Sequence, residues 1–277
     1  MMLAIKDLKV SFQHGPNNHT EVLHGINLSL NRGETLGIVG ESGSGKSVLS
    51  LATIGLLPDT AKASGQIIFN GENILTLSER ALCKIRGSKI GLIFQEPMTA
   101  LNPTMKIGNQ IAEGLRLHRK ISRKEAQIEA LRLLEMVKIS DAKRKMQSYP
   151  HEMSGGQRQR VGIAIAIALK PDLLIADEPT TALDVTVQAE ILDILDQLVR
   201  DLGIALIFIS HDLGVIARIA DRTLVMYHGN EMEQGETEQV LRHPRHEYTK
   251  KLLLAQPRRT RAAFAATSIN LGSFNEK

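Results

Sequence analysis

The chain has 277 residues, 43% of them hydrophobic, which is enough apolar material for one large domain, and its net charge of +4 is too evenly spread to indicate nucleic-acid binding. Cys83 is the single cysteine, so internal disulfides and multi-thiolate metal sites are excluded. No apolar run approaches the ~18 residues of a membrane span, and the sequence opens without a secretory signal pattern, so we expect a cytoplasmic protein.

The first part of the chain predicts antiparallel strands. Residues 3–12 and 22–30 alternate apolar and polar side chains with the period of a half-buried strand. Between them, residues 13–20 are polar and include a Gly-Pro-Asn-Asn run, so we expect a loop there. After a turn, residues 34–39 form an apolar run that predicts a buried strand.

That strand leads into Gly40-Glu41-Ser42-Gly43-Ser44-Gly45-Lys46-Ser47, which fits the phosphate-binding P-loop pattern G-x-x-x-x-G-K-[ST]. An apolar helix expected at 48–57 completes the order strand, glycine loop, helix. Glycines let backbone N–H groups surround phosphate oxygens, and the helix N-terminus adds positive potential. Lys46 is expected to reach the β- and γ-phosphates, and Ser47 to offer its hydroxyl to Mg²⁺. A chance glycine turn is the alternative, but the flanking elements favour nucleoside triphosphate binding by Gly40, Ser42, Gly43, Ser44, Gly45, Lys46 and Ser47.

The next part of the chain mixes strands and helices. After a break at 58–65, we expect a strand at 66–70 and a helix at 78–86. A further strand at 89–94 delivers Gln95 at its end. The amide of Gln95 is able to contact both a Mg²⁺ ion and a water molecule.

A helical insert follows. Residues 108–137 have the period of a helix, with a capping-box pattern at Ser122-Arg123-Lys124-Glu125. We interpret about residues 96–155 as a helical subdomain inserted into a domain that spans residues 1–256. Residues 257–277 carry arginines and then small and polar residues, and we expect a flexible tail there.

The second half of the chain alternates strands with helices. Buried strands are predicted at 173–176 and 204–209, with an amphipathic helix at 187–202 between them. This order favours an α/β fold with a mostly parallel core sheet, joined to the N-terminal antiparallel strands and the helical insert.

Two adjacent carboxylates follow the first of these strands. Consecutive strand residues point to opposite sides, so one carboxylate can address a metal ion and the other an attacking water. We assign Asp177 to Mg²⁺ and Glu178 to the role of general base, although such a pair taken alone would more often begin a polar loop. His211 follows the strand at 204–209, where ligands gather, and is either a γ-phosphate contact or a structural histidine.

A second glycine motif, Ser154-Gly155-Gly156-Gln157, opens a helix whose body at 161–169 is almost wholly apolar. A glycine pair at a helix N-terminus is a potential anion site, yet the P-loop already accommodates one triphosphate. The alternative is an N-cap serine followed by flexible glycines.

Together these motifs resemble the nucleotide-binding subunit of an ATP-binding cassette (ABC) transporter. The resemblance covers residues 3–256 and rests on the order and spacing of the P-loop, Gln95, Ser154-Gly155-Gly156-Gln157-Arg158-Gln159-Arg160, Asp177-Glu178-Pro179, Ala182-Leu183-Asp184 and His211. A narrower resemblance is to the dipeptide, oligopeptide and nickel importer branch. It lies in the P-loop, in Phe94-Gln95-Glu96-Pro97-Met98 and in the run 176–186.

In this family two cassettes meet head to tail. The resemblance therefore implies that Ser154, Gly155, Gly156 and Gln157 close over ATP held on the P-loop of a second ATPase chain. It also implies that Asp184 communicates across the interface between the two chains.

The resemblance implies further roles and partners. His211 would hold the γ-phosphate, Phe12 would stack on adenine, and Gln95 with residues 96–109 would line a groove for a helix of the membrane subunit. The implied protein hydrolyses ATP with Mg²⁺ at the cytoplasmic face of the membrane. Its partners would be transmembrane permease subunits and, indirectly, a solute-binding protein, and its function the uptake of peptides or a related small solute.

Departures from the family pattern are mild: Met153 stands where leucine usually precedes the serine, and Thr181 where many families have serine. The alternative function is an ABC ATPase that acts on nucleic acid or the ribosome. Such proteins usually fuse two cassettes or insert long coiled coils, and neither feature occurs in this sequence. We therefore expect no nucleic-acid partner.

Overall fold

The computed structural model describes residues 1–15, 18–95, 100–181 and 183–255. The chain divides into two compact units. Unit 1 contains Met1–Leu30, Thr35–Leu75 and the described chain from Phe208 onward, and unit 2 contains Asn31–Glu34 and the described part of Thr76–Ile207. Within the described ranges, no helix is both long enough and apolar enough to cross a membrane.

Three features named from the sequence lie outside the described residues. They are Glu96-Pro97-Met98 of the segment after Gln95, Ala182 of the motif that ends at Asp184, and the tail at 257–277. The expectations placed on them stay predictions.

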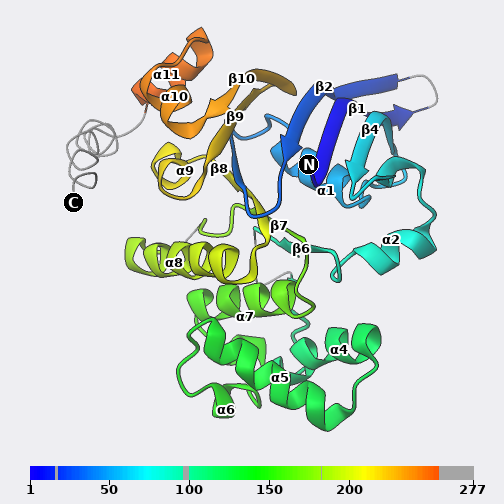
Figure 1. Cartoon of the computed structure of the whole chain (residues 1–277), viewed down its shortest axis with the longest axis vertical. Helices are drawn as coiled ribbons and strands as arrows, with labels where there is room; N and C mark the ends of the chain where they lie inside the picture. The colour runs from blue at the N-terminus through cyan, green and yellow to red at the C-terminus, as the bar shows by residue number, and fades with distance from the viewer. Residues whose placement is uncertain (16–17, 96–99, 182, 256–277) are drawn as a thin grey trace, which may run out of the picture. The chain divides into compact units, whose positions relative to one another are not determined.

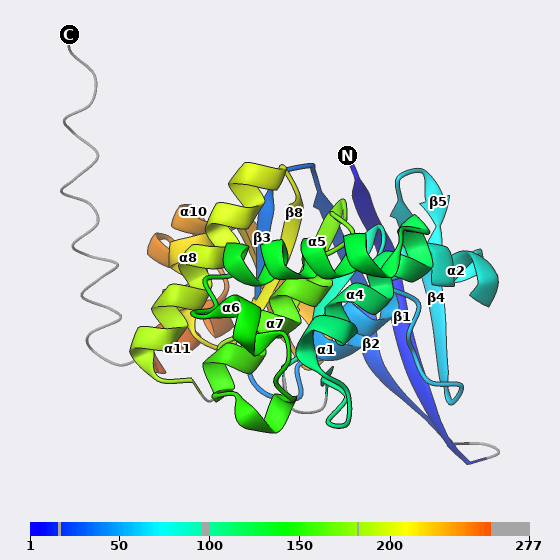
Figure 2. The same cartoon turned by 90° about the horizontal axis from the view of Figure 1, so that it is seen from below.

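Unit 1 begins with an antiparallel sheet in the strand order β2-β1-β4-β5. Its strands are β1 (Leu3–Gly15), β2 (Asn18–Leu30), β4 (Ala61–Phe69) and β5 (Glu72–Asn73). β1 pairs with both β2 and β4, and Figure 2 shows these three long strands side by side. The inward-facing side chains form a core that includes Leu3, Ile5, Leu8, Ile26 and Leu30.

The hairpin of β1 and β2 is longer than the sequence predicts. The loop expected at 13–20 is wrong for most of this stretch, because β1 continues to Gly15, β2 begins at Asn18, and Gln13 lies opposite His19. The side chains at this end of the hairpin are exposed or only partly buried, so no apolar alternation is needed. Backbone hydrogen bonds form the ladder, and a pattern based on hydrophobic period does not detect it.

The second part of unit 1 is a sheet in which β9 (Arg222–Tyr227) lies between β3 (Thr35–Val39) and β10 (Asn230–Glu236). β3 and β9 are parallel, and β10 is antiparallel to β9. β3 also adjoins β8 (Ala205–Ser210), which ends in unit 1. All of β3 is buried, as expected for a strand covered on both faces. The helices of unit 1 are α1 (Lys46–Thr53), α9 (Leu213–Ile219), α10 (Thr237–Arg242) and α11 (Glu247–Ala255).

Unit 2 combines parallel strands with a group of helices. β6 (Ile90–Ile93) pairs in parallel with β7 (Leu173–Asp177), and β8 begins beside β7. Helices α4 to α7 pack on one another and form the green group in Figure 1. The helices in the described part of this unit are α2 (Glu79–Ile85), α4 (Ile107–Arg119), α5 (Arg123–Met136), α6 (Ala142–Lys145), η2 (Pro150–Glu152), α7 (Gly155–Ile167) and α8 (Val185–Leu202), and η1 (Ile74–Thr76) leads from β5 toward α2. The boundaries of the helical subdomain, about 96–155, stay a prediction.

The capping box expected at Ser122 is present at the start of α5. Ser122 Oγ accepts a hydrogen bond from the Glu125 backbone N at 3.2 Å, and the Glu125 carboxylate accepts one from the Ser122 backbone N at 2.8 Å. Hydrogen bonds from Ser122 hold the pKa of Glu125 below its usual value. The two bonds satisfy N–H groups that a helix start leaves open, so α5 begins sharply.

Replacing Ser122 by alanine is expected to lower the free energy of unfolding by about 1 kcal/mol, because the Glu125 amide loses its acceptor. Ser78→Ala is the matched control: Ser78 occupies the N-cap of α2, but its side chain makes no capping hydrogen bond. Urea denaturation followed by circular dichroism measures both variants. Equal losses in the two variants would contradict the role given to Ser122.

Candidate functional site

The P-loop connects the end of β3 to the start of α1. Gly43 and Gly45 have φ angles of 80° and 96°, which residues with a Cβ rarely adopt. A Cβ at Gly45 would lie 2.7 Å from Leu23 Cδ2, and one at Gly40 would lie 2.2 Å from the carbonyl oxygen of Met226. The glycines are therefore needed both for the curvature of the loop and for its close packing against β2 and β9.

Lys46 organises the inside of the loop. Its Nζ donates hydrogen bonds to the carbonyl oxygens of Gly40 and Glu41, both at 2.8 Å, and to Ser44 Oγ at 3.3 Å. Lys46 is only 5% exposed, so these acceptors compensate for the lost hydration of a buried ammonium group. Ser47, the next residue, is exposed at the start of α1, and its hydroxyl is accessible to a ligand.

A two-residue turn between β9 and β10 is hydrogen-bonded to the P-loop. His228 and Gly229 both have positive φ, 43° and 74°, as in the type I′ turns of hairpins. The Gly229 N donates to the Ser44 carbonyl at 3.1 Å, and the Gly229 carbonyl accepts from the His24 N at 2.9 Å. The sequence does not predict this contact, because a turn dipeptide between two strands carries no sign of what the turn touches.

Phe12 and His211 are the other predicted site residues of unit 1. Phe12 is half-buried in β1, opposite Thr20 of β2 and Ala61 of β4. His211 is exposed and directly follows the last residue of β8, at the carboxyl end of the strand as expected. Their contacts to adenine and to the γ-phosphate stay predictions.

In unit 2, the adjacent carboxylates differ in backbone conformation. Asp177 is the last residue of β7, whereas Glu178 has a φ of 45°. The expectation that both follow the alternation of a strand is therefore wrong for Glu178, which lies beyond the strand in the left-handed region. A non-glycine residue in this region is strained by about 1 kcal/mol or more, and such strain clusters at functional sites.

The Glu178 carboxylate is held by two side chains of unit 2. Its Oε2 accepts hydrogen bonds from Thr181 Oγ1 at 2.8 Å and from Gln95 Nε2 at 3.4 Å. Gln95, a predicted site residue, thus lies next to the predicted general base. Thr181 was not predicted as a site residue. The only signal for it is its spacing of three from Glu178, which allows a single turn to bring the two side chains together.

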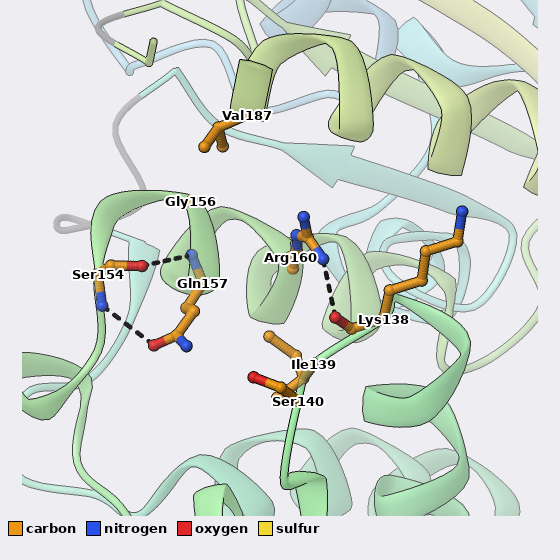
Figure 3. Close-up of a pocket in the computed structure, with 8 residues that line it drawn as sticks. All are labelled: Lys138, Ile139, Ser140, Ser154, Gly156, Gln157, Arg160 and Val187. Atoms are coloured by element: carbon orange, nitrogen blue, oxygen red, sulfur yellow. Dashed lines mark hydrogen bonds between the residues drawn. The ribbon is translucent and has the colours of Figure 1, made fainter.

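Ser154 and Gln157 form a reciprocal pair at the start of α7 (Figure 3). Ser154 Oγ accepts from the Gln157 N at 3.3 Å, and Gln157 Oε1 accepts from the Ser154 N at 3.2 Å. The N-cap interpretation is therefore correct for Ser154. Gly156 has a packing role, because a Cβ there would lie 2.5 Å from Val187 Cγ1. Ser154 itself is exposed, so this helix start is open to a ligand.

Asp184 caps the neighbouring helix α8. Its Oδ1 accepts a hydrogen bond from the Val187 N at 2.9 Å. Because Val187 also packs against Gly156, the start of α8 and the start of α7 are coupled through one side chain. Asp184 is exposed.

A pocket of about 180 Å³ lies beside these two helix starts (Figure 3). Arg160 forms part of its wall: Nη1 donates to the Lys138 carbonyl at 2.8 Å, and Nη2 pairs with Glu190. Arg160 thereby joins α7, α8 and the chain after α5. The pocket is lined by Lys138, Ile139, Ser140, Ser154, Gly156, Gln157, Arg160 and Val187.

Comparison with known proteins identifies the family of the chain. The family model described as ABC transporter matches residues 23–181, more than half of the chain. The chain belongs to the ABC transporter family.

Known ABC proteins match nearly the whole chain. It is 50% identical over 258 residues to the oligopeptide transport ATP-binding protein OppD of Salmonella typhimurium, which covers 93% of this chain and 77% of OppD. It is also 50% identical over 259 residues to the peptidoglycan transport ATP-binding protein YejF of Agrobacterium fabrum, which covers 93% of this chain and 47% of YejF. The fold is similar, with a TM-score of 0.76 and 29% identity, to the dimeric ATP-binding cassette MJ0796 in a post-hydrolysis state bound to ADP and Pi, which covers 85% of this chain and 99% of that one.

These likenesses confirm the predicted family and the predicted ABC ATPase fold. They also confirm that this ABC protein binds and hydrolyses ATP. The roles of individual residues stay predictions.

Gly156→Ala is expected to lower the free energy of unfolding by about 1–3 kcal/mol, because the added methyl group overlaps Val187 between α7 and α8. Gly162→Ala on the same helix is the control: a Cβ there meets nothing within 4 Å. It should stabilise the protein by up to about 1 kcal/mol through helix propensity. Chemical denaturation measures the stability of both variants. Adding Val187→Ala to Gly156→Ala should recover the lost stability. A loss that persists in the double variant would contradict the overlap.

Proposed function

We propose that this ABC ATPase powers the uptake of peptides or a related small solute across a membrane. The observation that carries the proposal is the 50% identity to OppD over 93% of the chain. The equal identity to YejF, whose name assigns it to peptidoglycan transport, supports peptide-like cargo in general over one particular peptide. Selection of the cargo then belongs to partner subunits.

The proposed partners are transmembrane permease subunits and, through them, a solute-binding protein, with the ATPase at the cytoplasmic face of the membrane. Gln95 and residues 96–109 are the proposed docking segment for a helix of the permease. Phe94 beside Gln95 supports this proposal, because it is 46% exposed, and an exposed aromatic side chain next to a polar one suits a protein interface.

The proposed active form is a head-to-tail pair of ATPase chains, with a second copy or a related chain as partner. The exposed Ser154 and the N–H groups at the start of α7 form an anion-binding surface in unit 2. In the proposed pair this surface closes over ATP on the P-loop of the partner, and Asp184 at the start of α8 contacts the interface. Closure on ATP binding and opening after hydrolysis would drive the permease.

Mg²⁺ is proposed to bind together with the triphosphate. The donor set that we assign to it comprises the Ser47 hydroxyl, the Gln95 amide oxygen and the Asp177 carboxylate. All are oxygen atoms, which Mg²⁺ prefers, and the amide nitrogen of Gln95 is directed at Glu178, which leaves its oxygen for the ion. When bound, the ion neutralises phosphate charge and orients the triphosphate.

Glu178 is proposed to be the general base. It accepts a proton from a water whose oxygen bonds to the γ-phosphorus, while the bond from that phosphorus to the bridging oxygen of ADP breaks. Thr181 and Gln95 orient the carboxylate. Lys46 turns its ammonium group from the loop carbonyls to the β- and γ-phosphates, and His211 contacts the γ-phosphate.

Glu178→Gln is expected to reduce ATP turnover by about 10²-fold or more, because an amide does not accept the proton of the attacking water. ATP affinity should stay close to the parental value, because the P-loop is unchanged. Steady-state phosphate release and equilibrium ATP titration measure the two quantities. Glu135→Gln, a change at an exposed carboxylate of α5 outside the proposed chemistry, is the control. Turnover by Glu178→Gln near the parental rate would show that another group is the base.

The transport proposal is tested by purifying the native membrane complex through this chain and by measuring oligopeptide uptake in cells that lack it. We expect permease subunits in the complex and loss of uptake, restored by the parental gene and not by its Glu178→Gln form. Recovery of ribosomes or nucleic acid without a permease, together with unchanged uptake of peptides, would overturn the proposal.

A further inference from the structure

A carboxylate of β10 holds the chain just before helix α11. Glu233 of β10 accepts hydrogen bonds from the backbone N of Arg245 at 2.8 Å and of His246 at 3.1 Å, the two residues just before α11. Burial alone raises the pKa of Glu233, but the hydrogen bonds outweigh it and hold this pKa below its usual value. Thr249 on the first turn is fully buried. In Figure 1, α10 and α11 lie beside the hairpin of β9 and β10.

This anchor places Tyr248 against the P-loop side of the hairpin. The ring of Tyr248 packs on the ring of Tyr227, the last residue of β9, with 4.2 Å between centroids and 32° between planes. The hydroxyl oxygen of Tyr248 is buried and makes no hydrogen bond of normal geometry. Burial raises the pKa of Tyr248. The backbone of Glu41, the second residue of the P-loop, acts to lower this pKa and the carboxylate of Glu41 acts to raise it, and the pKa stays above its usual value.

Glu41 and Tyr227, the two neighbours of Tyr248, are each connected to the P-loop. Glu41 supplies one of the carbonyl oxygens that hold Lys46 Nζ, at 2.8 Å. Tyr227 is followed by the turn whose Gly229 N donates to the Ser44 carbonyl. Tyr248 is therefore connected to the loop through Tyr227 and the turn that follows it, without lying in the loop, and its buried hydroxyl is not available to touch a nucleotide.

We propose that Tyr248 is a positioning residue of the ATP site: its ring supports Tyr227 and the turn that follows, and so keeps the P-loop in the shape that receives phosphates. α11 thus couples the C-terminal part of the described chain to ATP affinity. The proposal rests on the ATPase activity and is independent of the transported cargo, of the permease and of the second ATPase chain.

A purely structural role for Tyr248 predicts a different pattern of effects. If its ring only covered apolar surface, its loss would lower stability and the fraction of active protein, while the remaining molecules would bind ATP as before. A positioning role changes the dissociation constant itself. A titration gives both the fraction of protein that binds ATP and the dissociation constant. A fall in that fraction alone indicates a structural role, whereas a change in the dissociation constant indicates a positioning role.

The test compares Tyr248→Ala, Tyr248→Phe and Leu254→Ala in the full chain, by calorimetric titration with ATP and Mg²⁺ and by hydrogen exchange of the nucleotide-free protein. Leu254 is the control, since it lies on the same helix and is 67% exposed. We expect Tyr248→Ala to weaken ATP binding about 10-fold, and residues 40–46 to exchange faster. Tyr248→Phe keeps the ring contact and should remain within about threefold of the parent.

Two results would overturn the proposal. One is a dissociation constant for Tyr248→Ala equal to that of Leu254→Ala, with faster exchange confined to α11. The other is an equal loss of affinity in Tyr248→Ala and Leu254→Ala, because the effect would then belong to the helix in general and not to the Tyr248 ring.

Discussion

The ATP site depends on a positive charge buried inside a backbone loop. An ammonium group that is 5% exposed is costly unless polar groups surround it, and Lys46 finds them in the carbonyls of Gly40 and Glu41. The loop can curl this tightly because Gly43 and Gly45 adopt positive φ. The proposed ATP site needs the same curvature, because the N–H groups of a curled glycine loop can surround phosphate oxygens. Phosphate oxygens would then replace the carbonyls as partners of the ammonium group.

The residues to which we assign the chemistry occur in both units of the chain. Unit 1 contains the P-loop and His211, whereas unit 2 contains Glu178 with its partners Gln95 and Thr181. Unit 2 also presents the exposed helix start at Ser154. In the proposed pair, this helix start serves the triphosphate of the neighbouring chain, since each P-loop accommodates one triphosphate. ATP then holds two chains together, and its hydrolysis releases them.

Local patterns in the sequence predicted the parts of the site that local physics determines. The P-loop, the cap at Ser154 and the adjacent carboxylates at the end of β7 each depend on a few neighbouring residues. Contacts between distant segments were not predicted: the packing of Gly156 on Val187 and of Tyr248 on Tyr227 joins residues with no common pattern. The polar end of the hairpin was missed because backbone pairing needs no apolar period. The left-handed conformation of Glu178 has no signal at all, since residue type alone argues against it.

The central claim is that each working ATP site is built from two chains, and mixing two inactive variants tests it most directly. Lys46→Ala removes the phosphate contact, and Ser154→Arg blocks the closing surface. A mixed pair has one intact site, formed by the P-loop of the Ser154→Arg chain and the Ser154 of the Lys46→Ala chain. The account predicts that an equal mixture recovers about a quarter of the parental ATPase rate, whereas each variant alone is inactive. No recovery in a mixture that demonstrably forms mixed pairs would contradict it.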